Sequence, residues 1–230
     1  MKAPLLAGFA VLAAVAAPAS AEDMQGKVQV KLLGTAVLPD GKIDVKAVDT
    51  STTLGAAAAG ITTPFDTAAN DNVVPTVAIE YFFTNNLSVE TICCFTQHDV
   101  DGTGALAGAE MVSNARVIPA TFTAKYHVDG GAIRPYLGAG VTYFLWVKDK
   151  PGAFTVPLDI TDTNLSDEFG FVLQGGVDIP LNESGFGISL DAKRYFVDTT
   201  ARWYEGSTLA LESKHKLDPW VLSAGVTFAF

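Results

Sequence analysis

The chain has 230 residues, of which 49% are hydrophobic and 17% charged, and its formal net charge is −10. This acidic balance argues against nucleic acid as a partner, because binding to nucleic acid needs a basic face. After the N-terminal segment no run of about 18 apolar residues follows, so we expect no membrane-spanning helix; a closed β-barrel is the other structure that satisfies its backbone hydrogen bonds in lipid.

The first 21 residues have the pattern of a secretory signal peptide. Lys2 supplies the positive start, residues 5–17 form an apolar core, and Ala19-Ser20-Ala21 is a small-residue cleavage site. A permanent membrane anchor is the alternative, but the apolar core is short and the cleavage site follows it directly. We therefore expect residues 1–21 to be removed on export and residues 22–230 to form the mature domain.

Eight later segments alternate between apolar and small or polar side chains with period two, which predicts β-strands. In the sixth, Phe169, Phe171 and Leu173 share one face, while Glu168 and Gln174 share the other. An unbroken apolar row opposite small or polar residues is typical of strands that face lipid on one side and a lumen on the other. The eight segments are residues 27–38, 73–83, 87–96, 114–126, 134–147, 166–179, 186–197 and 217–230.

Short and long connections alternate between these strands. The short ones contain turn-forming residues, whereas the long ones have about 17 residues or more. Outer-membrane barrels have short periplasmic turns and long extracellular loops, so this asymmetry predicts four long extracellular loops and periplasmic termini. The short connections are 84–86, 127–133 and 180–185, and the long ones are 39–72, 97–113, 148–165 and 198–216.

The last strand strengthens this interpretation. From Trp220 to Phe230 one parity is entirely apolar, with aromatic residues near both ends, and no residue of the segment is charged. The fold class predicted is all-β, an eight-stranded antiparallel transmembrane β-barrel of the outer-membrane type. A soluble lipocalin-type barrel is the structural rival, but its apolar face would point inward. We also expect the barrel assembly machinery to act through the C-terminal strand ending in Phe230.

Several stretches of the chain resemble the outer-membrane protein W family. They are Tyr81 to Glu90, the run Arg-Pro-Tyr-Leu-Gly-Ala-Gly from Arg134, residues 165–170, residues 174–178, and Leu217-Asp-Pro-Trp with the strand that follows. The resemblance implies a narrow, largely hydrophobic interior that admits small hydrophobic compounds and releases them sideways into the membrane. Cys93-Cys94 and the Ala- and Gly-rich residues 55–60 depart from the family pattern, so no gating residue is carried over.

Charged residues are predicted on the lumen-facing parity of several strands. Buried charges must be paired or hydrated, so opposite charges are expected to meet inside the barrel. Two interpretations stay open: a polar plug that blocks simple diffusion, or charges that only hold the strands together. The residues are Glu80, Glu90, Lys125, Arg134, Asp178, Asp191 and Lys193.

A second set of inward residues is apolar or aromatic. Phe144 and Trp146 lie toward the long-loop end of their strand and are candidates to line a pocket for a hydrophobic ligand. The alternative is that a narrow barrel simply fills its interior with side chains. The full set is Phe82, Ile92, Phe144, Trp146, Val172 and Tyr195.

The segment Asp99–Glu110 matches part of the calcium-loop template, with Asp99, Asp101, Thr103 and Glu110 at ligand positions. Strands rather than helices are expected on both sides, so an ordinary acidic surface loop is the competing interpretation.

We expect neither catalysis nor a cofactor. His98, His127 and His215 lie in separate connections, and none shares a predicted strand face with a serine and an acid at a convincing spacing. The adjacent cysteines have no metal-binding spacing. Two functions remain: an outer-membrane barrel that binds or passively admits small hydrophobic molecules, or a non-transporting structural barrel whose loops meet envelope components, phage or host surfaces.

Overall fold

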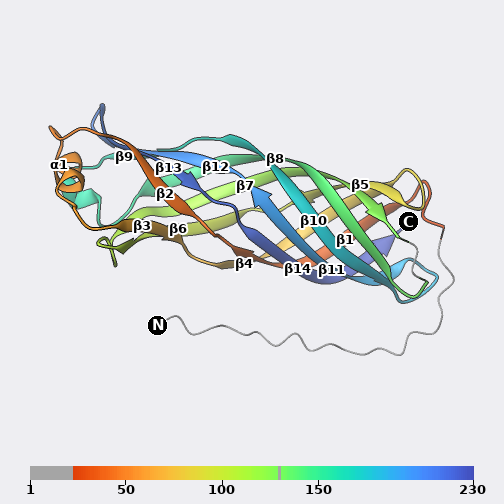
Figure 1. The fold of residues 1–230 in the computed structure, drawn as a ribbon. Helices are drawn as coiled ribbons and strands as arrows, with labels where there is room; N and C mark the ends of the chain where they lie inside the picture. The colour runs from red at the N-terminus through yellow and green to blue at the C-terminus, as the bar shows by residue number, and fades with distance from the viewer. Residues whose placement is uncertain (1–22, 129–130) are drawn as a thin grey trace.

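The computed structural model describes residues 23–128 and 131–230, apart from the side chain of Cys93. The predicted signal peptide, residues 1–21, lies outside the described residues. Figure 1 shows an elongated barrel seen from the side, with the short turns at one end and helix α1 at the other. We call these the short-turn end and the long-connection end.

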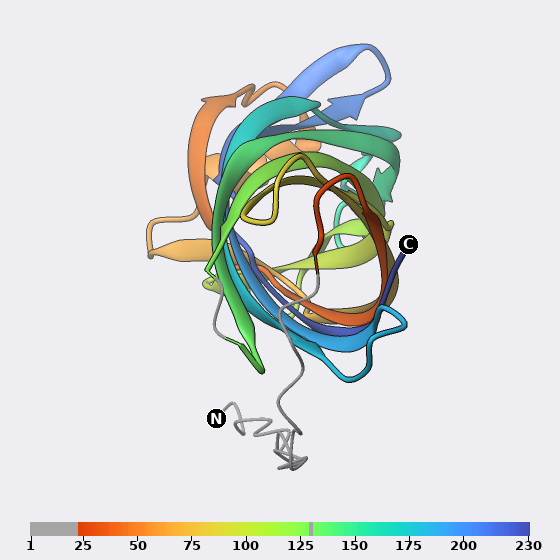
Figure 2. The same ribbon diagram turned by 90° about the vertical axis from the view of Figure 1, so that its right-hand side faces the viewer.

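Eight strand paths close the barrel, which confirms the predicted fold class. Every neighbouring pair is antiparallel, and the pairing of β7 with β8 completes the ring that Figure 2 shows end-on. In ring order the strands are β1 (Val28–Leu38), β4 (Asn72–Phe82), β5 (Leu87–Cys93), β7 (Glu110–His127), β8 (Arg134–Pro151), β10 (Glu168–Pro180), β11 (Phe186–Phe196) and β14 (Trp220–Ala229), with β14 returning to β1.

Burial along the barrel strands alternates with the same period of two residues as the sequence pattern. In β4 every second side chain from Val74 to Phe82 is buried, and the residues between them are exposed. The exposed set is apolar, including Val73, Ile79 and Tyr81, and Phe122 and Val141 continue it around the barrel. An apolar exterior around a partly polar interior is the arrangement that lipid requires and water disfavours, so the lipocalin-type alternative is wrong.

The third predicted strand is interrupted. Residues 87–96 were expected to run as one strand, but β5 ends at Cys93 and β6 (Thr96–Gly104) begins after Cys94 and Phe95. Phe95 turns outward and is 64% exposed, while β6 continues along β7 with shifts in register. Period two alone cannot reveal such a break, because alternation on each side of it looks alike.

The long connections are not simple loops. β2 (Lys42–Val48), β13 (Thr208–Lys216), β12 (Asp198–Glu205) and β9 (Asp162–Leu165) form a separate four-stranded sheet, and β3 (Phe65–Ala69) pairs with β6. Residues 198–216 alternate in burial like the barrel strands, so their period-two signal continues beyond the apolar band. Helix α1 (Thr53–Ala59) and the 3-10 helix η1 (Val156–Leu158) complete this end. In the described residues no helix has the length and apolar character needed to cross a bilayer.

Candidate functional site

The barrel interior has three tiers along its axis. Toward the short-turn end lies a charge cluster, which we define by the basic residues Lys31, Lys125, Arg134 and Lys193 and the acidic residues Glu80, Glu90, Asp178 and Asp191. Above it lies an apolar cavity, and the long-connection end is filled by an apolar cap. Each tier has a different chemistry.

At the centre of the charge cluster two lysines face two glutamates. The Nζ atom of Lys125 lies 2.7 Å from Glu80 Oε2 and 2.9 Å from Glu90 Oε2. Lys31 Nζ lies 3.0 Å from Glu80 and 3.1 Å from Asp178. Because these side chains are at most 5% exposed, water screens the ion pairs little, and each charge depends on its protein partners.

A second group joins the cluster to the wall of the barrel. Lys193 Nζ lies 2.7 Å from Asp191 and 3.1 Å from Glu90. Gln174 donates to the same two carboxylates, at 2.7 and 2.9 Å, and the Tyr136 hydroxyl donates to Asp191 at 2.7 Å. The three lysines and four acids of the cluster therefore form a continuous network of ion pairs and hydrogen bonds. The Arg134 guanidinium donates to the Asn85 carbonyl oxygen at the short-turn end.

All seven charged residues that the sequence analysis placed in the lumen are buried inside the barrel. Lys31, which is 1% exposed, was not predicted, although the same alternation indicates it: Gln29, Lys31 and Thr35 share the inward face of β1. Phe82, expected among the ligand-lining residues, instead lies at the short-turn end, with its ring 5.3 Å from the Arg134 guanidinium.

His127, which the sequence placed in a connection, instead ends strand β7. The structure brings His127, Ser88 and Glu80 together: His127 Nε2 lies 2.7 Å from Glu80 Oε1 and 3.1 Å from Ser88 Oγ. In a catalytic triad the acid orients the nitrogen remote from the serine, but here acid and serine share one nitrogen. All three side chains are fully buried. Glu80 joins this group to the charge cluster, and its geometry differs from that of a catalytic triad.

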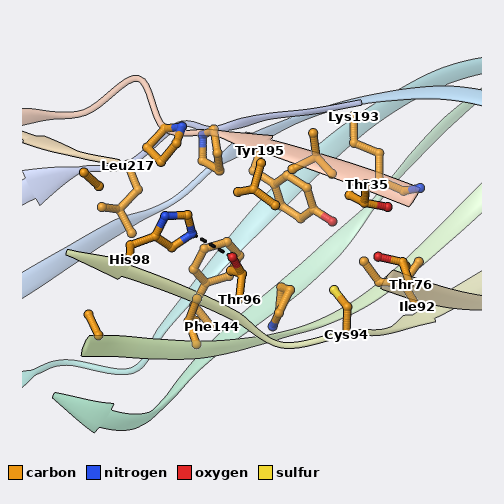
Figure 3. A pocket seen from close by; sticks show the side chains of 18 of the residues that line it. Thr35, Thr76, Ile92, Cys94, Thr96, His98, Phe144, Lys193, Tyr195 and Leu217 are labelled. Atoms are coloured by element: carbon orange, nitrogen blue, oxygen red, sulfur yellow. Dashed lines mark hydrogen bonds between the residues drawn. The ribbon is translucent and has the colours of Figure 1, made fainter. Parts of the chain in front are cut away.

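The apolar cavity lies directly above the charge cluster. Its volume is about 80 Å³, several times the space that one water molecule needs. Figure 3 shows Lys193, Thr35 and Thr76 on one side of it, Tyr195 and Phe144 in the middle, and His98 and Leu217 on the other side. Most of the remaining lining is aliphatic, including Leu33, Val37, Val117 and Val221.

Four residues predicted to face a ligand line this cavity: Ile92, Phe144, Trp146 and Tyr195. Val172 is fully buried and packs with Phe144 and Tyr195 in the cavity wall without lining the cavity. The small polar residues of the lining were not predicted, because a threonine on an inward-facing position looks like an ordinary residue filling the barrel. Thr35 and Thr76 are the important examples.

The apolar cap closes the long-connection end. It is a packed core to which α1, β7, β9, β12 and β13 all contribute. Trp203 at its centre is fully buried and donates its indole N–H to the carbonyl oxygen of Met111 at 3.1 Å. Further members are Leu54, Val112, Ile160, Leu165 and Leu211.

A seam runs down one side of this end. Within residues 23–128 and 131–230 no strand ladder joins β2 to β3. Side chains bridge the seam instead: the Ile43 amide donates to Asp66 Oδ1 at 2.8 Å, and Thr67 Oγ1 lies 3.2 Å from His215 Nδ1. Beneath the seam a second cavity of about 40 Å³ shares Pro39, Ala69, Val100, Trp146 and Leu217 with the apolar cavity.

Two histidines above the apolar band are held neutral. His98 Nδ1 lies 2.6 Å from the carbonyl oxygen of Asn70, so Nδ1–H donates and Nε2 accepts from Thr96 at 2.9 Å. Burial lowers the pKa of His98 below its ordinary value. Burial also lowers the pKa of His215 to about 4, although Asp66 acts in the opposite direction.

The segment proposed as a calcium loop folds as a β-hairpin. Asp101 pairs with Glu110 across β6 and β7. The carboxylates of Asp99 and Glu110 already accept hydrogen bonds, from the Asn114 amide and from Ser113 and the Ala153 amide. In the described part of the chain no group of three or more acidic, histidine or cysteine side chains is placed to hold a metal. With Thr103 also in the hairpin, the geometry gives no support to a calcium site.

Comparison with known proteins agrees with this architecture. The pattern of the OmpW family matches residues 24–230. The chain is 34% identical to the uncharacterized outer-membrane protein y4mB of Sinorhizobium fredii, over 72% of this chain and 69% of that protein. It is 25% identical to outer membrane protein W of Vibrio cholerae over 98% of both chains. The crystal structure of OprG from Pseudomonas aeruginosa superposes with a TM-score of 0.78 at 21% identity, over 92% of this chain and 99% of that one.

Proposed function

The chain belongs to the OmpW family of outer-membrane barrels, and we propose that it binds small hydrophobic molecules in the apolar cavity and passes them through the outer membrane. Its outer-membrane location was predicted from the exterior and the family resemblance, and the named relatives confirm it. The observation that carries the proposal is the cavity, an unfilled apolar space enclosed by Phe144, Tyr195 and aliphatic side chains. Apolar ligands bind such concave spaces because they leave water on entry.

The charge cluster supports a sideways rather than an axial route. A hydrophobic molecule that continued toward the short-turn end would have to displace buried ion pairs such as Lys125–Glu80, which is costly. In this proposal the cluster is the polar plug, and its network also holds the strands together. Orientation follows the pattern of outer-membrane barrels, with the long-connection end outside and the short turns periplasmic.

The seam between β2 and β3 supports a route into the cavity. The apolar cap fills the axial path with a packed core, whereas the seam is bridged by side chains and has the second cavity beneath it. Separating two side-chain bridges requires far less than unpacking Trp203 and its neighbours. We propose that solutes pass between the seam and the cavity, past Trp146 and Leu217.

The test removes the two largest apolar walls that the sequence also predicted. Replacing both Phe144 and Trp146 by alanine should lower octane binding at least tenfold, since each buried aromatic surface contributes roughly 1.5–3 kcal/mol. Binding is measured as radiolabelled octane retained by barrel-containing vesicles above protein-free vesicles of the same lipid. Octane uptake by cells carrying the variant should fall in parallel.

Tyr143→Ala with Leu145→Ala is the matched control. These residues alternate with the test pair on β8 but point outward, so octane binding should stay at the level of the unchanged protein. If a correctly assembled Phe144 and Trp146 double variant bound and admitted octane normally, the cavity would not be the site. The structural alternative, a barrel whose long-connection end serves as an interaction surface, would then be favoured.

A further inference from the structure

The hydroxyl of Thr76 is the feature of the cavity that the proposed function does not use. The side chain is 4% exposed and lines the cavity, and its Oγ1 atom has no hydrogen-bond partner among the described residues. The neighbouring hydroxyls of Thr35 and Ser223 satisfy each other at 2.9 Å. A buried hydroxyl without a partner is unfavourable, so Thr76 is suited to a ligand that brings a polar atom.

We propose that the cavity prefers neutral amphiphiles with one oxygen, such as aliphatic alcohols or ketones, and that Thr76 hydrogen-bonds this oxygen. Figure 3 places Thr76 beside Thr35 and Lys193, at the polar side of the cavity. The hydrocarbon chain then lies along Phe144 and Val117 toward Leu217. This inference rests on the proposed function and specifies the class of solute.

The charge cluster is the reason that we expect the polar group of the ligand to be neutral. Lys193 is the cluster's contact with the cavity, and its Nζ atom is already engaged by Asp191 at 2.7 Å and Glu90 at 3.1 Å. The three lysines of the cluster are already paired with its four carboxylates, so a carboxylate ligand would add a further negative charge without a counterpart. Burying an uncompensated charge is strongly unfavourable, whereas a neutral oxygen avoids that cost.

Trp146 offers an alternative anchor in the cavity lining. Its Nε1 atom is also buried without a hydrogen-bond partner among the described residues. However, Trp146 is partly exposed and borders the second cavity, among apolar neighbours such as Val100 and Leu217. Thr76 can both donate and accept and lies on the polar side of the cavity, so the oxygen is assigned to Thr76.

The experiment compares 1-octanol, octane and octanoate at pH 8, measured as retention by barrel-containing vesicles above protein-free vesicles. Thr76→Val keeps the shape of the side chain and removes the hydroxyl; it should weaken 1-octanol binding about three- to tenfold relative to octane binding. Thr76→Ser should retain 1-octanol binding. Trp146→Phe should leave the ratio of 1-octanol to octane unchanged. Octanoate should bind at least tenfold more weakly than 1-octanol.

Assembly of each variant is checked by the shifted gel mobility of the folded barrel. Equal losses of 1-octanol and octane in Thr76→Val, or a loss of 1-octanol in Trp146→Phe alone, would overturn the role of Thr76 while the proposed function stands. Octanoate binding more tightly than 1-octanol would overturn the preference for a neutral ligand. Failure of the unchanged protein to retain octane or 1-octanol would overturn the proposed function itself.

Discussion

The charge cluster and the apolar cavity are adjacent parts of one lumen that differ in how completely they are filled. In the cluster every lysine and every carboxylate has at least one charged partner, and Glu80 alone contacts Lys31, Lys125 and His127. In the cavity about 80 Å³ is empty, and the hydroxyl of Thr76 has no partner among the described residues. The filled region is suited to closing the barrel and holding it together, and the unfilled region to receiving a ligand.

Substitutions in the two regions are also expected to affect different properties of the protein. A change in the cluster leaves a charge without compensation, so its cost appears in stability. A change in the cavity lining alters an empty space, so its cost appears in ligand binding. Function and stability are therefore expected to respond to different residues within the same tube.

The largest effect is expected in the charge cluster. Glu80→Gln keeps the size of the side chain but removes the negative charge that Lys31 and Lys125 share. The free energy of unfolding should fall by about 3–5 kcal/mol. Reversible urea unfolding of the barrel from lipid vesicles measures it, and a loss below about 1 kcal/mol would mean that the cluster is not a tightly coupled network.

The next largest loss of stability is expected from a charge on the lipid-facing side of the barrel. Leu173 is 51% exposed on the apolar exterior, in the middle part of β10. Leu173→Arg places a charge in lipid and should cost roughly 2–4 kcal/mol near the midplane. The same vesicle assay applies. A change below about half a kcal/mol would contradict the outward orientation of this strand.

A smaller effect is expected at the seam, as a function of pH. His215 has a pKa of about 4 in the folded protein and about 6.5 when unfolded, so the unfolded chain takes up the proton first as the pH falls. Stability from neutral His215 is complete above pH 6.5, declines by about 1.4 kcal/mol per pH unit below it, and levels off near pH 4.

At pH 5 the expected loss is therefore about 2 kcal/mol relative to pH 8. His215→Gln should remove this contribution, so the difference between variant and unchanged protein must depend on pH in that window. A pH-independent difference would show that His215 does not titrate in this way. His98 shifts in the same direction and remains as a constant background in both proteins.

The smallest effect is expected on the outside of the four-stranded sheet. Arg202 Nε donates to Glu212 Oε2 at 2.7 Å, as close as Lys125 to Glu80, but the two side chains are 33% and 26% exposed. Solvent screens this pair, so Glu212→Gln should cost less than about 1 kcal/mol. A cost near that of Glu80→Gln would show that burial does not set the difference between the two regions.

The strands, and which side chains face outward, could be predicted because successive side chains alternate between the membrane and the lumen, which gives the sequence a period of two residues. Glu80, Lys125 and Lys193 were placed in the lumen by parity alone. Their partners could not be derived, since pairing Lys31 with Asp178 depends on how far the barrel closes and tilts. The long connections were predicted as loops because the expected strand length was that of the apolar band, whereas β2, β3, β9, β12 and β13 lie beyond it. The role of Thr76 depends on a missing partner, which no linear pattern reveals.

The pairing of β1 with β14 has a consequence for how the molecule forms. Gln29 lies opposite Ala229 and Leu38 opposite Trp220, so the contact that closes the ring joins residues about as far apart in sequence as the chain allows. Such a contact has a large loop-closure entropy and is typically made late in folding. Until β14 is synthesised and paired, β1 presents an open edge that invites association with other chains. The barrel must therefore be shielded as an incomplete sheet before it becomes a closed one.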